Sequence, residues 1–278
     1  MLTQQEKVSP TPFHLRLWYG FRLTITLAHE TLILLVRDRV MIPVLMCSVF
    51  ISIFANLASD WSVEDFTKIL FDIGSFGFSL TGSLIAIFWG TKILTDSRLE
   101  GSVEVQLSSP IARPLWLGGK FLGLISCLFL IGLGFGLIWQ LLMLGNEFGW
   151  MTLRQILLFS FFYLQWTVLA SLAMLFATMT SQATAMFSCL GLWLVGLSSA
   201  TIARTLSPDT PPFSRSLVQG IARLWNLQEF NFLPQALINT PLQHDEVMNI
   251  GMRFSYGITL VLFFLVVGCW SFNQRDLA

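Results

Sequence analysis

Few side chains in this 278-residue chain could do chemistry, and they lie outside its long apolar runs. His244-Asp245-Glu246 groups three metal-ligating residue types, but adjacent residues seldom converge on one ion, and a solvated loop is the alternative. Gly118-Gly119-Lys120 resembles the end of a phosphate loop, yet Phe121 follows where such a loop needs serine or threonine. We therefore expect no catalytic residue, no metal site and no cofactor site in this chain.

The composition is that of an integral membrane protein. Hydrophobic residues make up 54% of the chain and charged residues only 12%, whereas a soluble domain is about 25% charged. The mean hydropathy is +0.70. Sixteen basic and sixteen acidic residues cancel, so nucleic acid is not an expected partner.

The apolar runs also lack the residues that couple transport to an ion gradient. Proton- and sodium-coupled transporters keep carboxylates, histidines or basic residues within the membrane. No run has such a residue near its middle. If the chain takes part in transport, we expect the energy to come from another source.

Charge-free intervals locate the membrane helices, because an ionised side chain at the bilayer centre costs at least ~2.5 kcal/mol. The longest interval, 155–203, exceeds one helix, and Thr180-Ser181-Gln182-Ala183 divides it in two. The other intervals are close to or above the ~20 residues that cross a bilayer. The sequence thus predicts an all-α polytopic protein with six transmembrane helices, at about residues 40–59, 73–94, 120–144, 154–179, 184–203 and 253–273.

Six helices place both termini on one side of the membrane. With cytoplasmic termini, ten Lys and Arg residues fall inside and six outside, in agreement with the positive-inside rule. Residues 1–39 are then a cytoplasmic N-terminus with an interfacial elbow helix, which begins after a Thr11-Pro12 cap. Residues 40–278 form the transmembrane domain.

A polar segment separates the second and third predicted helices. Leu99, Val103 and Leu107 recur every four residues, which predicts an apolar stripe on one face of a short helix at about 97–109. The excess of acidic over basic residues favours a protein partner over an anionic lipid surface. A solvated loop with one helical turn is the alternative, and Ser109-Pro110 ends the segment in either case.

Glycine is frequent in the second and third predicted helices. Small residues let helices approach closely within a bilayer, so we expect these glycines to face other helices; the alternative is that glycine is simply common in membrane helices. They are Gly74, Gly77, Gly82 and Gly90 in the second helix, and Gly123, Gly132, Gly134 and Gly136 in the third.

The predicted outer loop, 204–252, contains five prolines and an amphipathic stretch from Leu217 to Trp225. This stretch is a candidate for a helix that enters the outer leaflet or caps a cavity. An ordinary surface helix is the alternative.

Several motifs resemble those of a known family. Glu100-Gly101-Ser102, Gln106-Leu107-Ser108-Ser109-Pro110-Ile111-Ala112-Arg113 and Leu117-Gly118-Gly119-Lys120-Phe121-Leu122-Gly123 are similar to a signature of ABC transporter permeases of the ABC-type-2 (type V exporter) class. The likeness is strongest to the branch that includes the permease of the nitrous oxide reductase maturation system. Thr31 to Val40 and Gln274-Arg275-Asp276-Leu277 match weakly. Asn226-Leu227-Gln228-Glu229-Phe230-Asn231 matches a further motif, except that Trp225 replaces a proline.

The resemblance implies the permease subunit of an ATP-binding-cassette exporter in a bacterial cytoplasmic (inner) membrane. Two permeases, identical or homologous, would pair and bind two copies of a separate ATP-binding subunit, which holds ATP and Mg; a periplasmic protein is a further partner that the resemblance allows. The segment at 97–109 would be the coupling helix that binds the ATPase, through Arg98, Leu99, Glu100, Val103, Glu104, Leu107, Ser109 and Pro110. The outer segment would form a re-entrant cap, with Leu217, Ile221, Leu224, Trp225, Asn226 and Phe230.

Two other functions stay open at this point. A membrane-embedded enzyme acting on lipids would need polar or metal-binding residues clustered at one membrane face. A non-transporting membrane assembly protein would need only the partner-binding segment.

Overall fold

The computed structural model describes residues 13–60, 66–99, 112–145, 150–205, 213, 216, 218–220, 224–232 and 244–274. Within these ranges every regular element is a helix, which confirms the predicted all-helical fold. In chain order the elements are α1 (Phe13–Val36), α2 (Met41–Asp60), α3 (Phe66–Leu99), α5 (Arg113–Gly145), α6 (Leu153–Met179), α7 (Gln182–Thr205), the 3₁₀-helix η1 (Leu227–Phe230) and α10 (His244–Gln274).

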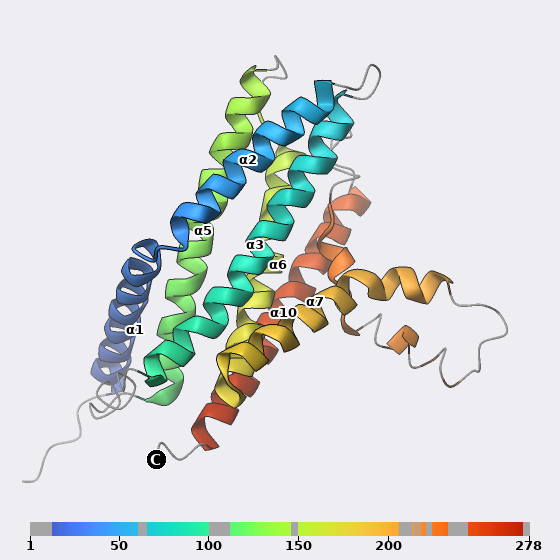
Figure 1. The fold of residues 1–278 in the computed structure, drawn as a ribbon. Helices are drawn as coiled ribbons and strands as arrows, with labels where there is room; N and C mark the ends of the chain where they lie inside the picture. The colour runs from blue at the N-terminus through green and yellow to red at the C-terminus, as the bar shows by residue number, and fades with distance from the viewer. Residues whose placement is uncertain are drawn as a thin grey trace, which may run out of the picture.

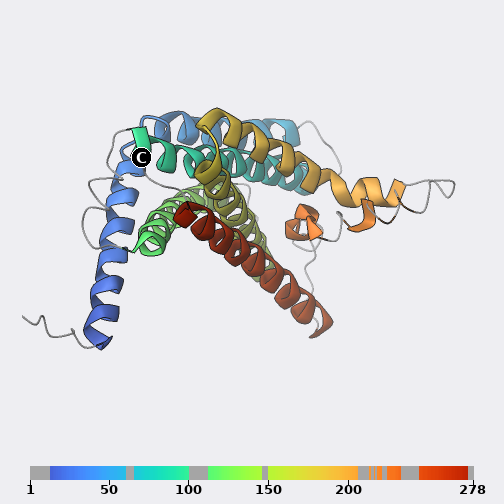
Figure 2. The same cartoon turned by 90° about the horizontal axis from the view of Figure 1, so that it is seen from below.

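Helix α6 is the central element of the bundle and contacts α3, α5, α7 and α10 (Figures 1 and 2). Its residues from Phe161 to Thr178 are almost all buried. A helix that is apolar on every side is stable only when other helices enclose it or lipid surrounds it. Phe78 of α3 packs into an aromatic cluster on one side of α6, with ring centroids 4.4 to 5.6 Å from those of Phe135, Phe159, Phe162 and Trp166.

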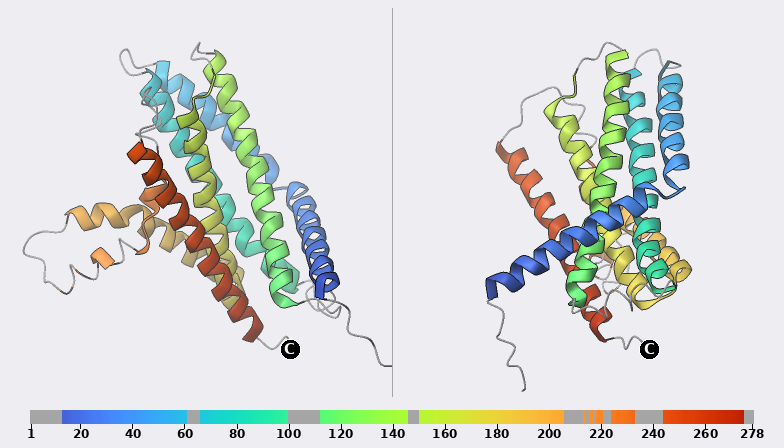
Figure 3. Two further views of the ribbon diagram at one scale, coloured as in Figure 1. Left: turned by 180° about the vertical axis from the view of Figure 1, so that it is seen from behind. Right: turned by 90° about the vertical axis from the view of Figure 1, so that its left-hand side faces the viewer.

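The helix ends gather at two opposite ends of the bundle (Figures 1 and 3). One end, at the bottom of Figure 1, holds the start of α1, the end of α3, the start of α5, the turn between α6 and α7 and the end of α10. We call it the terminal end. The opposite end holds the end of α2, the start of α3, the end of α5 and the start of α6.

Five of the described helices are long and apolar enough to cross a membrane: 68–97 within α3, α5, α6, 182–199 within α7, and α10. The remaining predicted span, 40–59, corresponds to α2, whose apolar part, Ile42–Ala58, is shorter than the other five. The six-span count therefore stays a prediction. Helix α10 begins at His244, inside the predicted outer loop, so the solvated loop expected at His244-Asp245-Glu246 is instead the first turn of a helix.

Helix α1 packs across α5 rather than lying only against a membrane surface (Figure 3, right). Its buried side chains Leu27 and Thr31 contact Gly119 and Gly123 of α5, whereas Ile25 is 50% exposed. A Cβ atom on Gly123 of α5 would lie 2.5 Å from Thr31 Cβ, a distance that side chains do not adopt. Helix α1 thus has one face on α5 and another, apolar face that is exposed.

The glycines of α3 and α5 behave differently. Each of the four α3 glycines approaches a side chain of another helix: Gly74 meets Trp139, Gly77 meets Ile51, Gly82 meets Trp166 and Gly90 meets Ala173. In α5 the expectation holds for Gly123 and, at ordinary contact distance, for Gly132. It is wrong for Gly134 and Gly136, where an added Cβ would meet nothing within 4 Å among the described residues.

Candidate functional site

The predicted partner-binding segment lies between the ends of α3 and α5 at the terminal end. Arg98 and Leu99 are the last residues of α3. Glu100, Val103, Glu104, Leu107, Ser109 and Pro110 lie outside the described residues. What the structure supplies is the position from which this segment leaves α3 and returns to α5.

The first turns of α5 hold three helices together at the terminal end. The ring of Trp116 stacks on that of Phe272 of α10 with centroids 5.5 Å apart, and Arg113 Nη1 donates to the carbonyl oxygen of Asn273 at 3.1 Å. On another side, a Cβ on Gly119 would lie 2.8 Å from Leu27 Cβ of α1. The start of α5, which carries the Gly118-Gly119-Lys120 motif, therefore serves helix packing.

A polar cavity of about 350 Å³ lies beside this junction, lined by residues of α1, α3, α5 and the turn after α1. Lys92 Nζ donates to Asp38 Oδ2 at 2.6 Å across it. Lys120 also lines the cavity, is only 3% exposed and lies 5.8 Å from the Trp116 ring centroid, a geometry in which the ring face attracts a cation. The other charged residues that line it are Glu30 and Asp96.

The ionised form of Asp38 is stabilised in this cavity. Burial by itself would raise the pKa of Asp38, but hydrogen bonds from Lys92 and from the Val40 N–H, together with the Lys92 charge, bring the pKa below its ordinary value. Asp38 therefore ties the turn between α1 and α2 to Lys92 of α3. Lys92 lies about one helical turn before the segment at 97–109 begins.

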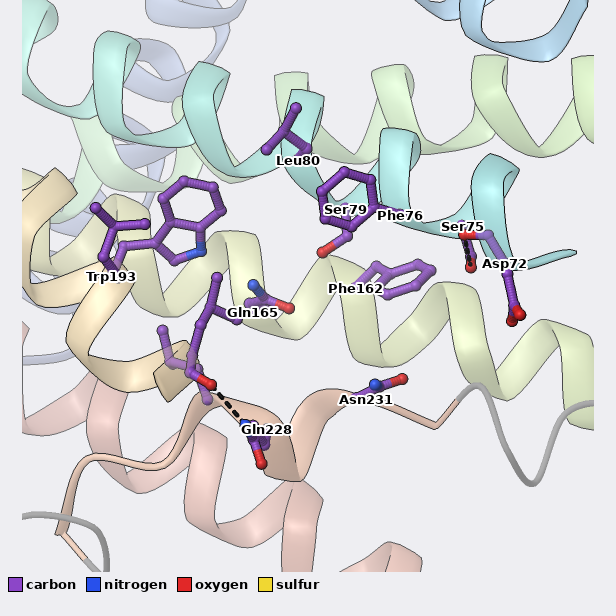
Figure 4. A pocket seen from close by; sticks show the side chains of 13 residues that line it. Asp72, Ser75, Phe76, Ser79, Leu80, Phe162, Gln165, Trp193, Gln228 and Asn231 are labelled. Carbon is purple, nitrogen blue, oxygen red and sulfur yellow. Dashed lines mark hydrogen bonds between the residues drawn. The ribbon is translucent and has the colours of Figure 1, made fainter. Parts of the chain in front are cut away.

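A second cavity, which we call the α3–α7 cavity, has a volume of about 630 Å³ and lies between α3, α6, α7 and η1 (Figure 4). Apolar lining residues include Phe76, Leu80, Phe162, Leu194, Leu197 and Leu227. Its polar lining residues are Asp72, Ser75, Ser79, Gln165, Trp193, Gln228 and Asn231. Gln165, only 3% exposed, donates through Nε2 to Ser83 Oγ at 3.4 Å.

The described part of the predicted cap closes one side of this cavity. Gln228 Nε2 donates to the carbonyl oxygen of Leu197 at 2.6 Å and to Thr201 Oγ1 at 2.9 Å. Asn226 caps η1 by accepting from the Gln228 N–H at 3.1 Å, and its own N–H donates to the Tyr256 hydroxyl. Buried Phe230 stacks on the ring of Tyr256. Segment 224–232 is thus fixed to both α7 and α10.

Trp225 takes part in the same attachment. Its Nε1 donates to the carbonyl oxygen of Leu192 at 2.6 Å, and its own carbonyl oxygen accepts from Ser199 Oγ at 2.9 Å. Of the other predicted cap residues, Leu224 is 75% exposed, while Leu217 and Ile221 lie outside the described residues.

Two ion pairs fasten the same side of the molecule. Arg154 Nη2 of α6 lies 2.9 Å from Glu246 Oε2 of α10, and the Arg154 side chain is only 5% exposed. Arg253 of α10 pairs with Glu229 of η1 at 3.4 Å. Glu246, one of the three residues considered for a metal site, therefore binds an arginine, and the described residues contain no cluster of three metal-ligating side chains.

A third cavity, the α5–α10 cavity, lies on the other side of α6 and measures about 700 Å³. It is lined mainly by apolar residues, with Gly132 and Gly136 of α5 on one wall and Phe254 and Ile258 of α10 on another. Its polar lining residues are Gln140, Ser160 and Tyr163. Gly136, at which an added Cβ would meet nothing within 4 Å among the described residues, thus lies beside an open apolar space.

The residues of the α3–α7 cavity do not stand out in the sequence as a site. Trp193 lies in an uninterrupted apolar run, where nothing in the sequence distinguishes it from a tryptophan facing lipid. Gln165 carries a signal, because a buried amide within a charge-free run needs a polar partner.

A family model described as ABC-2 family transporter protein matches residues 13–277, nearly the whole chain. A search of curated proteins found no match.

Proposed function

The chain belongs to the ABC-2 transporter family, and on that premise we propose that it is the permease subunit of an exporter that a separate ATP-binding subunit drives. As a member of this family it is a multi-pass transmembrane permease of an ABC transporter. The export direction, the coupling to ATP hydrolysis and the partner contacts are the proposal.

The observation that carries the proposal is the meeting of helix ends at the terminal end. Leu99 of α3 and Arg113 of α5 lie there together with the start of α1 and the end of α10. The segment between α3 and α5 therefore emerges on the side that the charge distribution assigns to the cytoplasm, where ATP is available. A partner bound to this segment acts directly on two long helices.

Helix α3 offers a mechanical path from that segment to the α3–α7 cavity. It is continuous from Phe66 to Leu99, and its residues Ser75 and Ser79 line the cavity. A displacement of its terminal end moves the whole helix, because α-helices are stiff over this length and their packed interfaces do not deform continuously. The Lys92–Asp38 pair makes α1 follow the same movement.

The complete assembly that we propose contains two permeases, identical or homologous, and two ATP-binding subunits that hold ATP and Mg. It lies in a bacterial inner membrane with both permease termini in the cytoplasm. The motifs at Gln106 to Arg113 and Asn226 to Asn231 support a place in the nitrous oxide reductase maturation branch. In that case a periplasmic protein is a further partner.

Substitution Val103→Asp tests the coupling role. A charge in an apolar groove loses its hydration without gaining a partner, so the variant permease should insert into the membrane but release the ATP-binding subunit. We expect at least about a tenfold loss of co-purified ATPase. Val247→Asp is the matched control, since Val247 is 51% exposed near the start of α10, at the far side of the molecule.

Two results would contradict the proposal. The wild-type permease, expressed with its native neighbours, would bring down no ATP-binding subunit, or Val103→Asp would retain as much of that subunit as Val247→Asp does.

A further inference from the structure

The α3–α7 cavity contains a hydrogen-bond donor that has no acceptor. Trp193 is 6% exposed, and its indole Nε1 is buried and makes no hydrogen bond in the described structure. Figure 4 shows the indole ring at one end of the cavity with its nitrogen directed toward the side of Gln165. A buried donor without a partner costs about 1–3 kcal/mol, and a ligand that supplies an oxygen atom would recover that energy.

Two other tryptophans, Trp89 and Trp139, also have buried indole nitrogens. That of Trp89 interacts with the Asp38 carboxylate and helps to lower its pKa, whereas that of Trp139 has no hydrogen-bond partner among the described residues. Neither is among the residues that line the α3–α7 cavity. Trp193 is therefore the member of this group whose side chain lines the cavity, and Trp139 provides a comparison of the same chemical type.

The charges around the cavity define the kind of molecule that it accepts. No lysine, arginine or histidine is among its described lining residues, and the single charged group there is the carboxylate of Asp72. Asp72 is exposed and lies near the start of α3, away from Trp193. An anionic ligand would meet like charge and no counter-charge, which disfavours phosphate and carboxylate head groups.

The size and the lining point to an amphiphile. Cavities for small molecules measure about 300–1,000 Å³ and combine mostly apolar walls with a few polar groups, and this one has about 630 Å³. The larger α5–α10 cavity has apolar walls, but none of the buried, unpartnered side-chain atoms of the described residues lines it. Of these two cavities, the α3–α7 cavity unites space for an acyl chain with a donor for an oxygen.

We propose that the α3–α7 cavity binds the cargo of this permease, and that the cargo is a neutral lipid-like molecule whose carbonyl or hydroxyl oxygen accepts from Trp193 Nε1. The inference rests on the proposed transport function and names its substrate class. Gln228 holds the wall of the cavity by its bonds to Leu197 and Thr201, so that the cap segment closes over the bound molecule.

The test uses the purified full-length permease in nanodiscs and a monoacylglycerol that carries a diazirine on its acyl chain. We expect saturable labelling of peptides from α3, α6 and α7. Trp193→Phe keeps the ring but removes the donor, and should weaken the apparent affinity about fivefold, as expected for one hydrogen bond. Ser79→Phe, which fills the cavity, should abolish labelling, whereas Trp139→Phe should leave it unchanged.

Three outcomes would overturn the inference. The first is the absence of saturable labelling, which would also follow if a second copy of the chain filled the cavity. The second is equal labelling of the wild type and of both cavity variants. The third is stronger labelling of the cavity by a diazirine phosphatidylglycerol than by the monoacylglycerol. Because the assay needs no ATP-binding subunit, its failure leaves the co-purification result intact. Conversely, cavity labelling without ATPase binding would overturn only the proposed function.

Discussion

At the level of single residues, Gly196 explains how Trp225 can stand where the related motif has proline. A Cβ on Gly196 would lie 2.6 Å from Trp225 Nε1 and 2.7 Å from Leu227, so both side chains need the bare backbone at this position. Trp225 then reaches the carbonyl oxygen of Leu192 and fixes the cap segment by a hydrogen bond that proline could not make.

Substitution Gly196→Ala should therefore destabilise the cap. Overpacking of this kind costs about 1–3 kcal/mol, and the loss should appear as a lower midpoint in thermal unfolding of the purified permease. Gly191→Ala is the matched control, because Gly191 lies in the same helix with nothing within 4 Å of an added Cβ among the described residues. Equal midpoints for the two variants would show that Gly196 is not needed for the close approach.

The Asp38–Lys92 pair makes a pH-dependent contribution. The pKa of Asp38 is lowered in the folded protein, so its stabilisation is present above the unfolded-state pKa of about 3.9 and is lost as pH falls through the folded-state pKa. Asp38→Asn should lower the free energy of unfolding by about 1–2 kcal/mol near pH 7. The difference from wild type should begin to shrink below about pH 4 and should vanish once the pH is below the lowered folded-state pKa of Asp38.

Thermal unfolding between pH 7 and pH 3 measures this difference. A double-mutant cycle of Asp38→Asn with Lys92→Gln isolates the interaction energy of the pair. Glu30 and Asp96 line the same cavity in every protein of the cycle. A difference that stays constant over the whole range would show that the interaction does not depend on the Asp38 charge.

At the level of the elements, a polar break within a charge-free interval predicts where one helix ends and the next begins. The apolar runs that contain α6 and α7 are divided by Thr180-Ser181, and the structure ends α6 at Met179 and begins α7 at Gln182. Packing partners could not be predicted in the same way. Glycine at 123 and glycine at 134 are identical in the sequence, and only the neighbouring helix α1 makes them different.

The packing of α1 on α5 gives a prediction at this scale. In Gly123→Ala the new Cβ would lie 2.5 Å from Thr31 Cβ and 2.6 Å from the carbonyl oxygen of Ala28, so α1 must move away from α5. Limited trypsin cleavage at Arg37 and Arg39, in the turn after α1, should become about tenfold faster. Trypsin should cleave Gly134→Ala at the same rate as wild type. Equal cleavage rates for the two variants would argue against a tight α1–α5 contact.

For the whole molecule, the arrangement of helix ends makes the topology testable. A cysteine at Ser102 should react only with reagents that reach the cytoplasm, and a cysteine at Trp150, in the connection from α5 to α6, only with reagents added outside. Both variants need a background without the four native cysteines, of which Cys47 is exposed. Labelling of the Ser102 position from outside would invert the proposed orientation and remove the ATPase contact.

The limit of sequence-based prediction at this scale is the three-dimensional assembly of polar groups. The family motif at Asn226 to Phe230 predicts a cap, and the structure gives its described residues hydrogen bonds to α7 and α10. The cavity beneath it is made from α3, α6 and α7, and α3 is far from the other two helices in the chain. Trp193 is distinguished by a nitrogen that is buried without a partner, a property that no local pattern encodes.

The α1–α5 contact has a consequence for the order of biosynthesis. Helix α1 leaves the ribosome first, but the face that receives Leu27 and Thr31 is made by Gly119 and Gly123 of α5, which are translated only after α2 and α3. Until then the buried side of α1 has no α5 surface to cover it. A nascent chain that stops after α3 must therefore leave this side of α1 without α5, exposed to lipid or to an insertase. Docking of α1 marks the moment at which α5 has entered the membrane.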